Sequence, residues 1–308
     1  MNNILARVYD TLFHVCKKRD LHKWDITPQS DKNIYGVYHV YCDTGWEKLV
    51  VKQIESLKSS GLFDATTTFY VSCITSNDCD VDKLKKIVDS DKLAIISVTD
   101  NPQRYEYPAL EFVKHISDAE DCMIYYFHTK GISYQTSDCK ERNFLSFKNK
   151  IVAWCEMMEY FIFFKWNIAV NVLNAGYDTY GCYLWPPKKQ KMYSGSYWWA
   201  NSLYIRTLPD FCEDVISHDR FYSETWLFEH SHKYFSAFDT IADLYFVRIP
   251  RSIYVQGNTK IMDKFRFIFM YNYRKIQKHV FGYNYKKRCQ HKFQKLKKKG
   301  YECLVKGI

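Results

Sequence analysis

Residues 122–133 read CMIYYFHTKGIS, an apolar run that stops abruptly at a polar turn. Residues 123–127 are apolar or aromatic without alternation, which is typical of a central strand in a parallel sheet covered on both faces. The polar residues that follow are therefore expected at the carboxyl end of a strand. In open α/β sheets this edge binds ligands, because the connecting loops gather there.

The polar turn holds His128, Thr129, Lys130 and Gly131. A titratable ring and a fixed positive charge favour an anionic ligand such as a phosphate group, and the glycine allows a close backbone approach or a positive φ. The alternative is structural, with Lys130 a solvated turn lysine and His128 a hydrogen-bonded residue at a strand end. These few residues alone leave both interpretations open.

The first half of the chain alternates predicted strands with predicted helices. Apolar and β-branched runs predict the strands, and amphipathic runs after turn residues predict the helices. The strands are 34–42, 66–74, 93–98 and 123–127, and the helices between them are 46–58, 81–88 and 108–116. This alternation predicts an α/β fold with a Rossmann-type, mostly parallel sheet flanked by helices.

The second half has a less regular pattern. Residues 148–173 are apolar almost all round and predict one long, buried helix. Strands at 180–184 and 193–200 and helices at 211–216 and 220–230 follow. We expect a single domain over residues 1–263, with a nucleotide-binding half at about 34–147 and a second half at about 148–263, and then a helical tail over 264–308.

Positive charge is concentrated in the tail. Residues 264–308 hold fourteen lysine or arginine residues and one acid, Glu302, a balance of +13; because the whole chain carries +10, the first 263 residues carry −3. Aromatic residues are interspersed with these cations. The pattern fits an anionic membrane surface, a nucleic-acid arm or a solvated helix face, and we expect the membrane surface rather than nucleic acid.

Cysteine usage and hydropathy bear on location. The eleven cysteines are scattered singly, with no C-x-x-C pair, which favours a reducing compartment over a disulfide framework or a zinc site. The amino terminus lacks a signal-peptide layout, and no apolar run reaches the roughly 18 residues that span a bilayer. We therefore expect a cytoplasmic protein, peripheral at the inner face of the membrane.

Five motifs in their order resemble a known family. They are SGLFD (60–64), YEYPAL (105–110), YFHTKGIS (126–133), YSGSYWWA (193–200) and RFYSETWL (220–227). Together they are similar to bacterial and large-virus glycosyltransferases that assemble capsule, lipopolysaccharide and other glycans. The resemblance covers about residues 34–227. It implies a GT-A-like fold whose Rossmann-like half binds a nucleotide sugar and whose second half receives a glycan or lipid-linked saccharide acceptor.

The resemblance also assigns residues to the two substrates. It implies that the phosphates and sugar of the donor are bound by His128, Thr129, Lys130, Gly131 and Glu106. It implies that the acceptor is bound by Ser194, Gly195, Ser196, Trp198 and Trp199. Ser196 stands where the family commonly has Asn. Because adjacent strand residues face opposite sides, we expect one tryptophan in the core and the other in the acceptor cleft. Two core tryptophans are the plainer alternative.

Sugar transfer needs a group that takes the proton of the acceptor hydroxyl. Glu224, Glu106 and Glu229 are the candidate carboxylates. We expect Glu224 to be the catalytic base of an inverting transfer, because it precedes the apolar pair Trp226 and Leu227 and lies in the acceptor half. An exposed helix glutamate is the structural alternative.

The chain departs from the usual GT-A pattern at the metal site. An Asp-x-Asp motif normally follows the fourth strand, where this chain has His128, Thr129 and Lys130; Asp80-Val81-Asp82 comes too early and begins a predicted helix. We assign no metal ligands and expect a metal-independent reaction, with Mn²⁺ or Mg²⁺ as the open alternative. A non-catalytic nucleic-acid- or membrane-binding protein competes with the enzyme, whereas no G-x-G-x-x-G supports a Rossmann oxidoreductase.

Overall fold

A computed structural model describes residues 15–28, 30–185, 191–255, 257 and 260–305. The chain forms two units. Residues 18–136 and 158–239 make up one, the sheet unit, and residues 1–17, 137–157 and 240–308 make up the other, the helical unit. These limits differ from the expected division into residues 1–263 and a tail, because the tail belongs to the same unit as residues 137–157.

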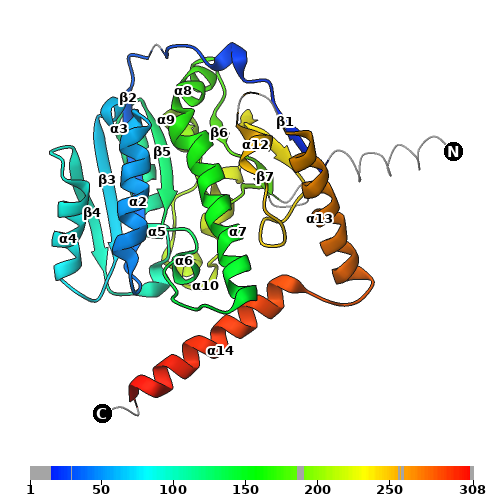
Figure 1. Cartoon of the computed structure of the whole chain (residues 1–308). Coiled ribbons are helices and arrows are strands. Elements are labelled where there is room, and N and C mark those ends of the chain that lie inside the picture. The colour runs from blue at the N-terminus through cyan, green and yellow to red at the C-terminus, as the bar shows by residue number, and fades with distance from the viewer. Residues whose placement is uncertain (1–14, 29, 186–190, 256, 258–259, 306–308) are drawn as a thin grey trace. The chain divides into compact units, whose positions relative to one another are not determined.

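A seven-stranded sheet runs through the sheet unit (Figure 1), in the order β10-β6-β9-β5-β2-β3-β4. Its parallel first half consists of β2 (Asn33–Tyr41), β3 (Thr68–Ile74), β4 (Leu93–Thr99) and β5 (Cys122–His128). Strand β9 (Trp198–Asn201) is antiparallel to β5 and to β6 (Thr179–Gly181), while β10 (Tyr234–Ser236) is parallel to β6. The expected α/β class and mostly parallel sheet are confirmed.

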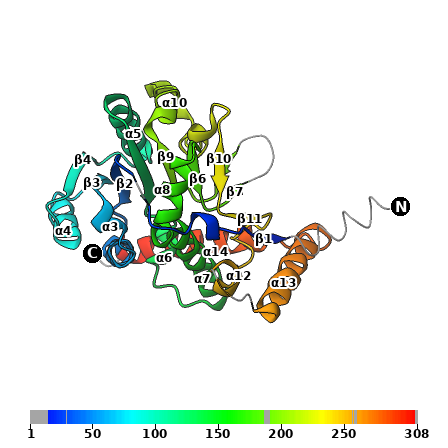
Figure 2. The same cartoon turned by 90° about the horizontal axis from the view of Figure 1, so that it is seen from above.

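Helices cover both faces of this sheet, as the unbroken apolar runs predict. Every residue of β5 is buried. On one face, Val37 and Tyr126 join a core with residues of α5 (Tyr107–Ala119). On the other, Tyr38 stacks on Phe127 and donates a hydrogen bond to Gln53 of α2 (Trp46–Ser59). Figure 2 shows α5 and α3 (Leu62–Ala65) on opposite sides of β2.

Strands β2 and β5 form the topological switch point of the sheet. From β2 the chain moves outward through β3, α4 (Cys79–Val88) and β4, and α5 then returns it to the other side of β2 as β5. The connections that leave β2 and β5 therefore run in opposite directions. Such a crevice, beyond the carboxyl ends of the two strands, is where open α/β sheets bind ligands.

The second half deviates from the predicted elements. The expected helix at 148–173 is α7 (Arg142–Glu159), a π-helical turn (Tyr160–Phe164) and α8 (Trp166–Asn174), and the break falls at Lys165, whose φ of −117° is not helical. The expected strand at 193–200 is divided between β8 (Met192–Tyr193) and β9. The shorter elements of the sheet unit are β7 (Leu184–Trp185), α6 (Ile132–Gln135), α9 (Ser202–Ile205), α10 (Glu213–His218), α11 (Tyr222–Thr225), a 3-10 turn (Trp226–Phe228) and two further turns (His22–Trp24 and Pro102–Arg104).

The helical unit contains the tail. Helix α13 (Ile261–His279) and helix α14 (Tyr285–Val305) follow α12 (Arg251–Tyr254), while β1 (Cys16–Lys18) and β11 (Phe238–Thr240) lie at the limits of the units. Phe293 stacks on Phe144 of α7 with 5.1 Å between ring centroids, and Tyr285 contacts Phe147. The tail is helical as expected, but it shares a core with α7. Among the described helices, none combines the length and apolarity required to cross a bilayer.

Candidate active site

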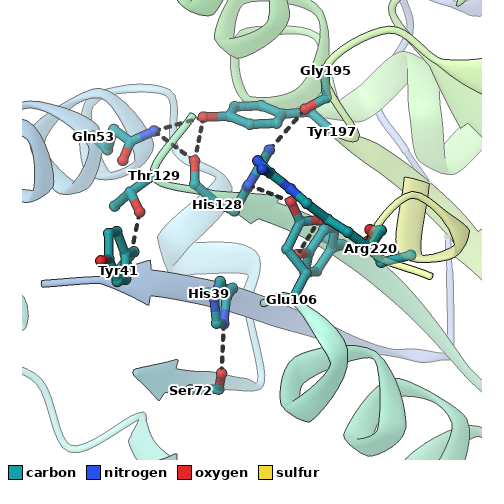
Figure 3. A network of polar contacts seen from close by, with 12 residues as sticks. His39, Tyr41, Gln53, Ser72, Glu106, His128, Thr129, Gly195, Tyr197 and Arg220 are labelled. Carbon is teal, nitrogen blue, oxygen red and sulfur yellow. Dashed lines mark hydrogen bonds and ion pairs between the residues drawn. The ribbon is translucent and has the colours of Figure 1, made fainter. Parts of the chain in front are cut away.

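Two histidines lie side by side at the switch point of the sheet. His39 of β2 and His128 of β5 are partners in the strand register, and Ser72 of β3 is the next partner of His39. A polar row therefore crosses three neighbouring strands near their carboxyl ends, on the face that α5 covers (Figure 3). His128 lies at the carboxyl end of β5, as expected, and His39 joins it.

Both ring nitrogens of His128 face hydrogen-bond acceptors. Nδ1 lies 2.9 Å from Oε1 of Glu106, and Nε2 lies 3.0 Å from the carbonyl oxygen of Gly195. A carboxylate and a carbonyl oxygen only accept, so a protonated ring, with a hydrogen on each nitrogen, satisfies both contacts. Protonated His128 places a cation at the end of β5.

Glu106 is the counter-ion of that cation. Burial opposes its ionisation, but the charge of His128, its hydrogen bond to the carboxylate and the charges of Lys130 and His39 outweigh burial and lower the pKa of Glu106 to about 2. The buried hydroxyl of Tyr126 donates to the same carboxylate at 3.0 Å. The preceding residue, Tyr105, has a φ of 46°, a conformation that costs a non-glycine residue about 1–3 kcal/mol. Glu106 is therefore an ionised anchor held in a defined position.

His39 is the neutral partner of the pair. It is buried, and Nδ1 lies 2.8 Å from Oγ of Ser72. Burial lowers its pKa to about 4, with Glu106 acting against this shift and the charged His128 adding to it. His39 is therefore a neutral imidazole at neutral pH, next to His128 on the neighbouring strand.

The backbone of the strand end is anchored from several directions. Tyr197 donates to the carbonyl oxygen of His128 at 2.6 Å, and Gln53 of α2 donates to Tyr197 at 2.7 Å (Figure 3). The hydroxyl of Thr129 accepts a hydrogen bond from the backbone of Tyr41. Thr129 is itself buried and thus joins β5 to β2 instead of offering its hydroxyl to a ligand.

Lys130 and Gly131 form the turn that leaves the strand. Gly131 has a φ of 66°, as the sequence allowed, and precedes α6. The amide of Lys130 donates to the carbonyl oxygen of His128, and the side-chain charge acts on Glu106. A second cation therefore lies within electrostatic range of the imidazolium.

The YSGSYWWA stretch is core structure, contrary to the expectation that one tryptophan lines a cleft. Trp198 stacks on Tyr126 on one face of the sheet, and Trp199 contacts Tyr125 on the other. Both rings are buried, as are Ser194 and Ser196. The two rings do lie on opposite faces of the sheet, as expected. Both faces are covered by other side chains, so neither ring reaches a cleft. This stretch is linked to the site by the Gly195 carbonyl oxygen, which contacts the His128 ring, and by the Tyr197 hydroxyl, which donates to the His128 carbonyl oxygen.

Glu224 lies in α11 and is half-buried. Its charge is close enough to raise the pKa of Tyr126, after the larger effects of burial and of Glu106. In the described part of the chain, its carboxylate accepts no hydrogen bond and joins no ion pair. Glu229, the other candidate, is exposed. Glu224 therefore remains available to a substrate hydroxyl near the Glu106 cluster.

The described residues do not fit a metal centre. No three or more His, Cys, Asp or Glu side chains among them are grouped so that they could hold a metal ion. In the D-x-D stretch, the carboxylate of Asp80 accepts a hydrogen bond from the hydroxyl of Thr75 at 2.7 Å and forms an ion pair with Lys83 at 3.2 Å. Asp82 is exposed. No step proposed below involves a metal.

The sequence did not single out His39, Gln53, Tyr197 and Arg220. His39 is enclosed by strand-forming residues in IYGVYHVYC, and a polar residue near the end of a first strand was its one signal. Gln53 is a buried polar residue on an otherwise apolar helix face. Arg220, drawn with the cluster in Figure 3, has its guanidinium 5.2 Å from the ring centroid of Tyr105.

No protein-family model matches the sequence, and no curated protein matches it significantly.

Proposed function

We propose that this chain is an inverting glycosyltransferase that moves a sugar from a nucleotide-sugar donor to a glycan or lipid-linked saccharide, as in capsule or lipopolysaccharide synthesis. The observation that carries the proposal is the cluster of His128, paired with Glu106 and followed by Lys130, at the carboxyl edge of the switch point. Departure of a nucleoside diphosphate concentrates negative charge on phosphate oxygens, and fixed cations stabilise that charge without reorganisation.

The acidic residues fit complementary roles. Glu106 holds His128 charged and oriented, and its free lone pairs accept hydroxyl groups of the donor sugar. Glu224 takes the proton when the acceptor hydroxyl oxygen attacks the anomeric carbon; the new C–O bond forms while the bond to the diphosphate breaks, and the diphosphate leaves with the electron pair. The available carboxylate of Glu224 supports this role.

We also propose that residues 264–308 hold the enzyme at an anionic membrane. Large apolar side chains are exposed along α13 at helical spacing: Ile261, Phe265, Phe269, Tyr273, Ile276 and Val280. Lysines and arginines flank this row, as in helices that lie in a lipid interface. Replacing Phe265 and Phe269 by serine should release the protein from phosphatidylglycerol vesicles in a sedimentation assay; equal binding would contradict the docking.

A panel of nucleotide sugars tests the enzymatic proposal. Full-length protein is incubated with each donor and a mixed glycan acceptor, and released nucleoside diphosphate is measured. One donor should turn over, turnover should survive a chelator, and Lys130→Ala should lower it at least about tenfold, since a charged contact to phosphate is lost. Lys86→Ala removes an exposed lysine of α4 and should change nothing. Turnover that requires manganese would overturn the metal-free assignment, and no turnover of any donor would count against the enzyme.

A further inference from the structure

A basic hollow lies within the helical unit, in residues to which the proposed reaction gives no task. It has a volume of about 450 Å³ and is lined by Lys140, Arg142, Leu145, Ser146, Asn149, Lys150 and Arg248. Most of the lining comes from the first two turns of α7 and the residue pair before it. Arg248 comes from the segment before α12, so two parts of the chain about a hundred residues apart in sequence meet here.

The lining contains four cations and no acid. In the described chain, Lys140, Arg142 and Arg248 take part in no ion pair. The neighbouring Glu141 does not compensate them, because it pairs with Lys292 at 3.0 Å and accepts the amide of Phe144. The hollow therefore concentrates positive charge that no carboxylate within it balances.

Lys150 is the best-ordered cation of the four. It donates to the carbonyl and hydroxyl oxygens of Ser146, both at 2.9 Å, and to the hydroxyl of Tyr285 at 3.2 Å. All three acceptors are neutral. Burial, followed by the nearby charge of Arg274, lowers the pKa of Lys150 to about 8. An anion in the hollow would relieve this unfavourable placement of a positive charge.

The position on α7 adds to the attraction. Arg142 is the first residue of this 18-residue helix, so it lies at the positive end of the helix dipole. Arginine guanidinium groups bind phosphate oxygens in a two-pronged geometry.

We propose that this hollow binds a phosphate group carrying two or more negative charges, such as a diphosphate or a phosphomonoester. Carboxylate ligands fit less well, because four cations face a single small volume. The site is independent of the proposed glycosyl transfer, whose donor phosphates are assigned to His128 and Lys130. The same chemistry occurs in a soluble diphosphate and in a lipid headgroup.

Calorimetric titration of the full-length chain with inorganic pyrophosphate tests the site. The double variant Arg142→Gln/Arg248→Gln should weaken binding at least about tenfold, since two charged contacts are lost. The matched control Lys48→Gln/Lys86→Gln removes two exposed lysines outside the hollow and outside residues 264–308, so the change in net charge is equal. Binding in the control should stay within about twofold of the original chain. Circular dichroism verifies that both variants are folded.

Vesicles then separate the two sources of phosphate. Phosphatidylcholine vesicles are compared with and without phosphatidic acid, whose headgroup is a phosphomonoester, in the presence and absence of pyrophosphate. Capture that pyrophosphate displaces identifies a lipid headgroup, whereas pyrophosphate binding without such capture identifies a soluble ligand. The exposed apolar residues of α13 can also bind vesicles. The effect of the hollow is therefore measured as the difference in vesicle binding between the two double variants.

Two results would overturn the proposal. One is equal weakening in the hollow variant and its control, which would mean that net charge alone attracts the anion. The other is the absence of binding by the original chain, seen as no heat of binding and no chemical-shift change when pyrophosphate is added to millimolar concentration. Neither result bears on donor turnover, so the site and the proposed function fail separately.

Discussion

The polarity of the candidate site depends on a single residue, His128. Its two ring nitrogens donate to Glu106 and to the carbonyl oxygen of Gly195, and its own carbonyl oxygen accepts from Tyr197. The β4–α5 loop and the turn after β8 each supply one acceptor to the ring of this largely buried histidine, and Tyr197 fixes its backbone.

The neighbouring His39 predicts a pH dependence of stability. Its pKa is about 4 in the folded chain and 6.5 as usual in the unfolded chain, so between these values only the unfolded chain binds the proton. The free energy of unfolding should therefore fall as the pH drops through this window, by at most about 1.4 kcal/mol per pH unit. Glu106 adds a similar loss only below its usual pKa of 4.5, towards 2.

The variant His39→Gln isolates this effect. Glutamine can still hydrogen-bond to Ser72 but does not titrate, so urea midpoints between pH 7 and pH 5 should become flatter than in the original chain. His115→Gln, an exposed histidine of α5, is the matched control and should retain the original slope. Parallel slopes for all three proteins would show that His39 is not the titrating group.

Glu224 gives a kinetic prediction at the same scale. Glu224→Gln keeps the shape of the side chain but cannot take a proton, so transfer to the acceptor should fall by about two orders of magnitude or more while donor binding is retained. Initial rates and donor titration by fluorescence measure the two effects separately. Glu106→Gln should instead weaken donor use. Near-normal transfer by Glu224→Gln, with an unchanged pH profile, would exclude it as the base.

At the scale of elements, close packing between the central strands requires a glycine. An ideal Cβ on Gly36 of β2 would overlap the ring of Tyr125 on β5 and approach Phe69 of β3 to 2.7 Å. Tyr125 is fixed by its hydrogen bond to Thr66 and is fully buried, so it cannot move aside. The sheet therefore tolerates no side chain at this position.

The variant Gly36→Ala should lose about 1–3 kcal/mol of stability through overpacking. Adding Tyr125→Leu, which removes the ring that the methyl group meets, should restore part of this loss in a double-mutant cycle. Chemical unfolding of the four proteins measures the coupling. Strictly additive losses would mean that the alanine is accommodated by a backbone shift.

The sequence predicts the elements of the first half of the sheet unit more accurately than those of the second half. The strands at 34–42, 93–98 and 123–127 were predicted to within one residue at each end, because buried parallel strands are continuous apolar runs between turn residues. The π-helical turn before Lys165 was not predicted. A helix break shows in the sequence as an interruption of the apolar periodicity, and a segment that is apolar all round has no such periodicity. Trp198 and Trp199 were misplaced for a similar reason: alternation gives the face of a residue, but only the tertiary structure says what covers that face.

For the candidate site, the sequence singled out His128, Lys130, Glu106 and Gly195 but not the contacts between them. The ion pair joins residues 22 positions apart, and the contact with Gly195 joins residues 67 positions apart. No local pattern contains such pairs. Neighbouring strands bring His39 and His128 together, so this contact could be inferred only after the strand order was known.

At the scale of the whole molecule, the two units are interwoven in sequence, and the basic tail is part of one of them. Phe144 and Phe147 of α7 are buried, as are Tyr285, Cys289 and Phe293 of α14. Phe267 of α13 is buried as well. A tail whose only role is attraction to anions would expose all of its aromatic residues, so these buried positions indicate a structural role.

Deletion of residues 264–308 should therefore destabilise the helical unit. The deletion removes the partners of Phe144 and Phe147, and the loss of one buried aromatic side chain typically costs about 3–5 kcal/mol. Hydrogen exchange followed by mass spectrometry should show lost protection over residues 137–157, while strands β2 to β5 keep theirs. Phe281→Ser, at a side chain that is 74% exposed, should leave both regions protected. Unchanged protection of residues 137–157 in the truncated chain would mean that α7 is stable without the tail, and that α13 and α14 serve binding alone.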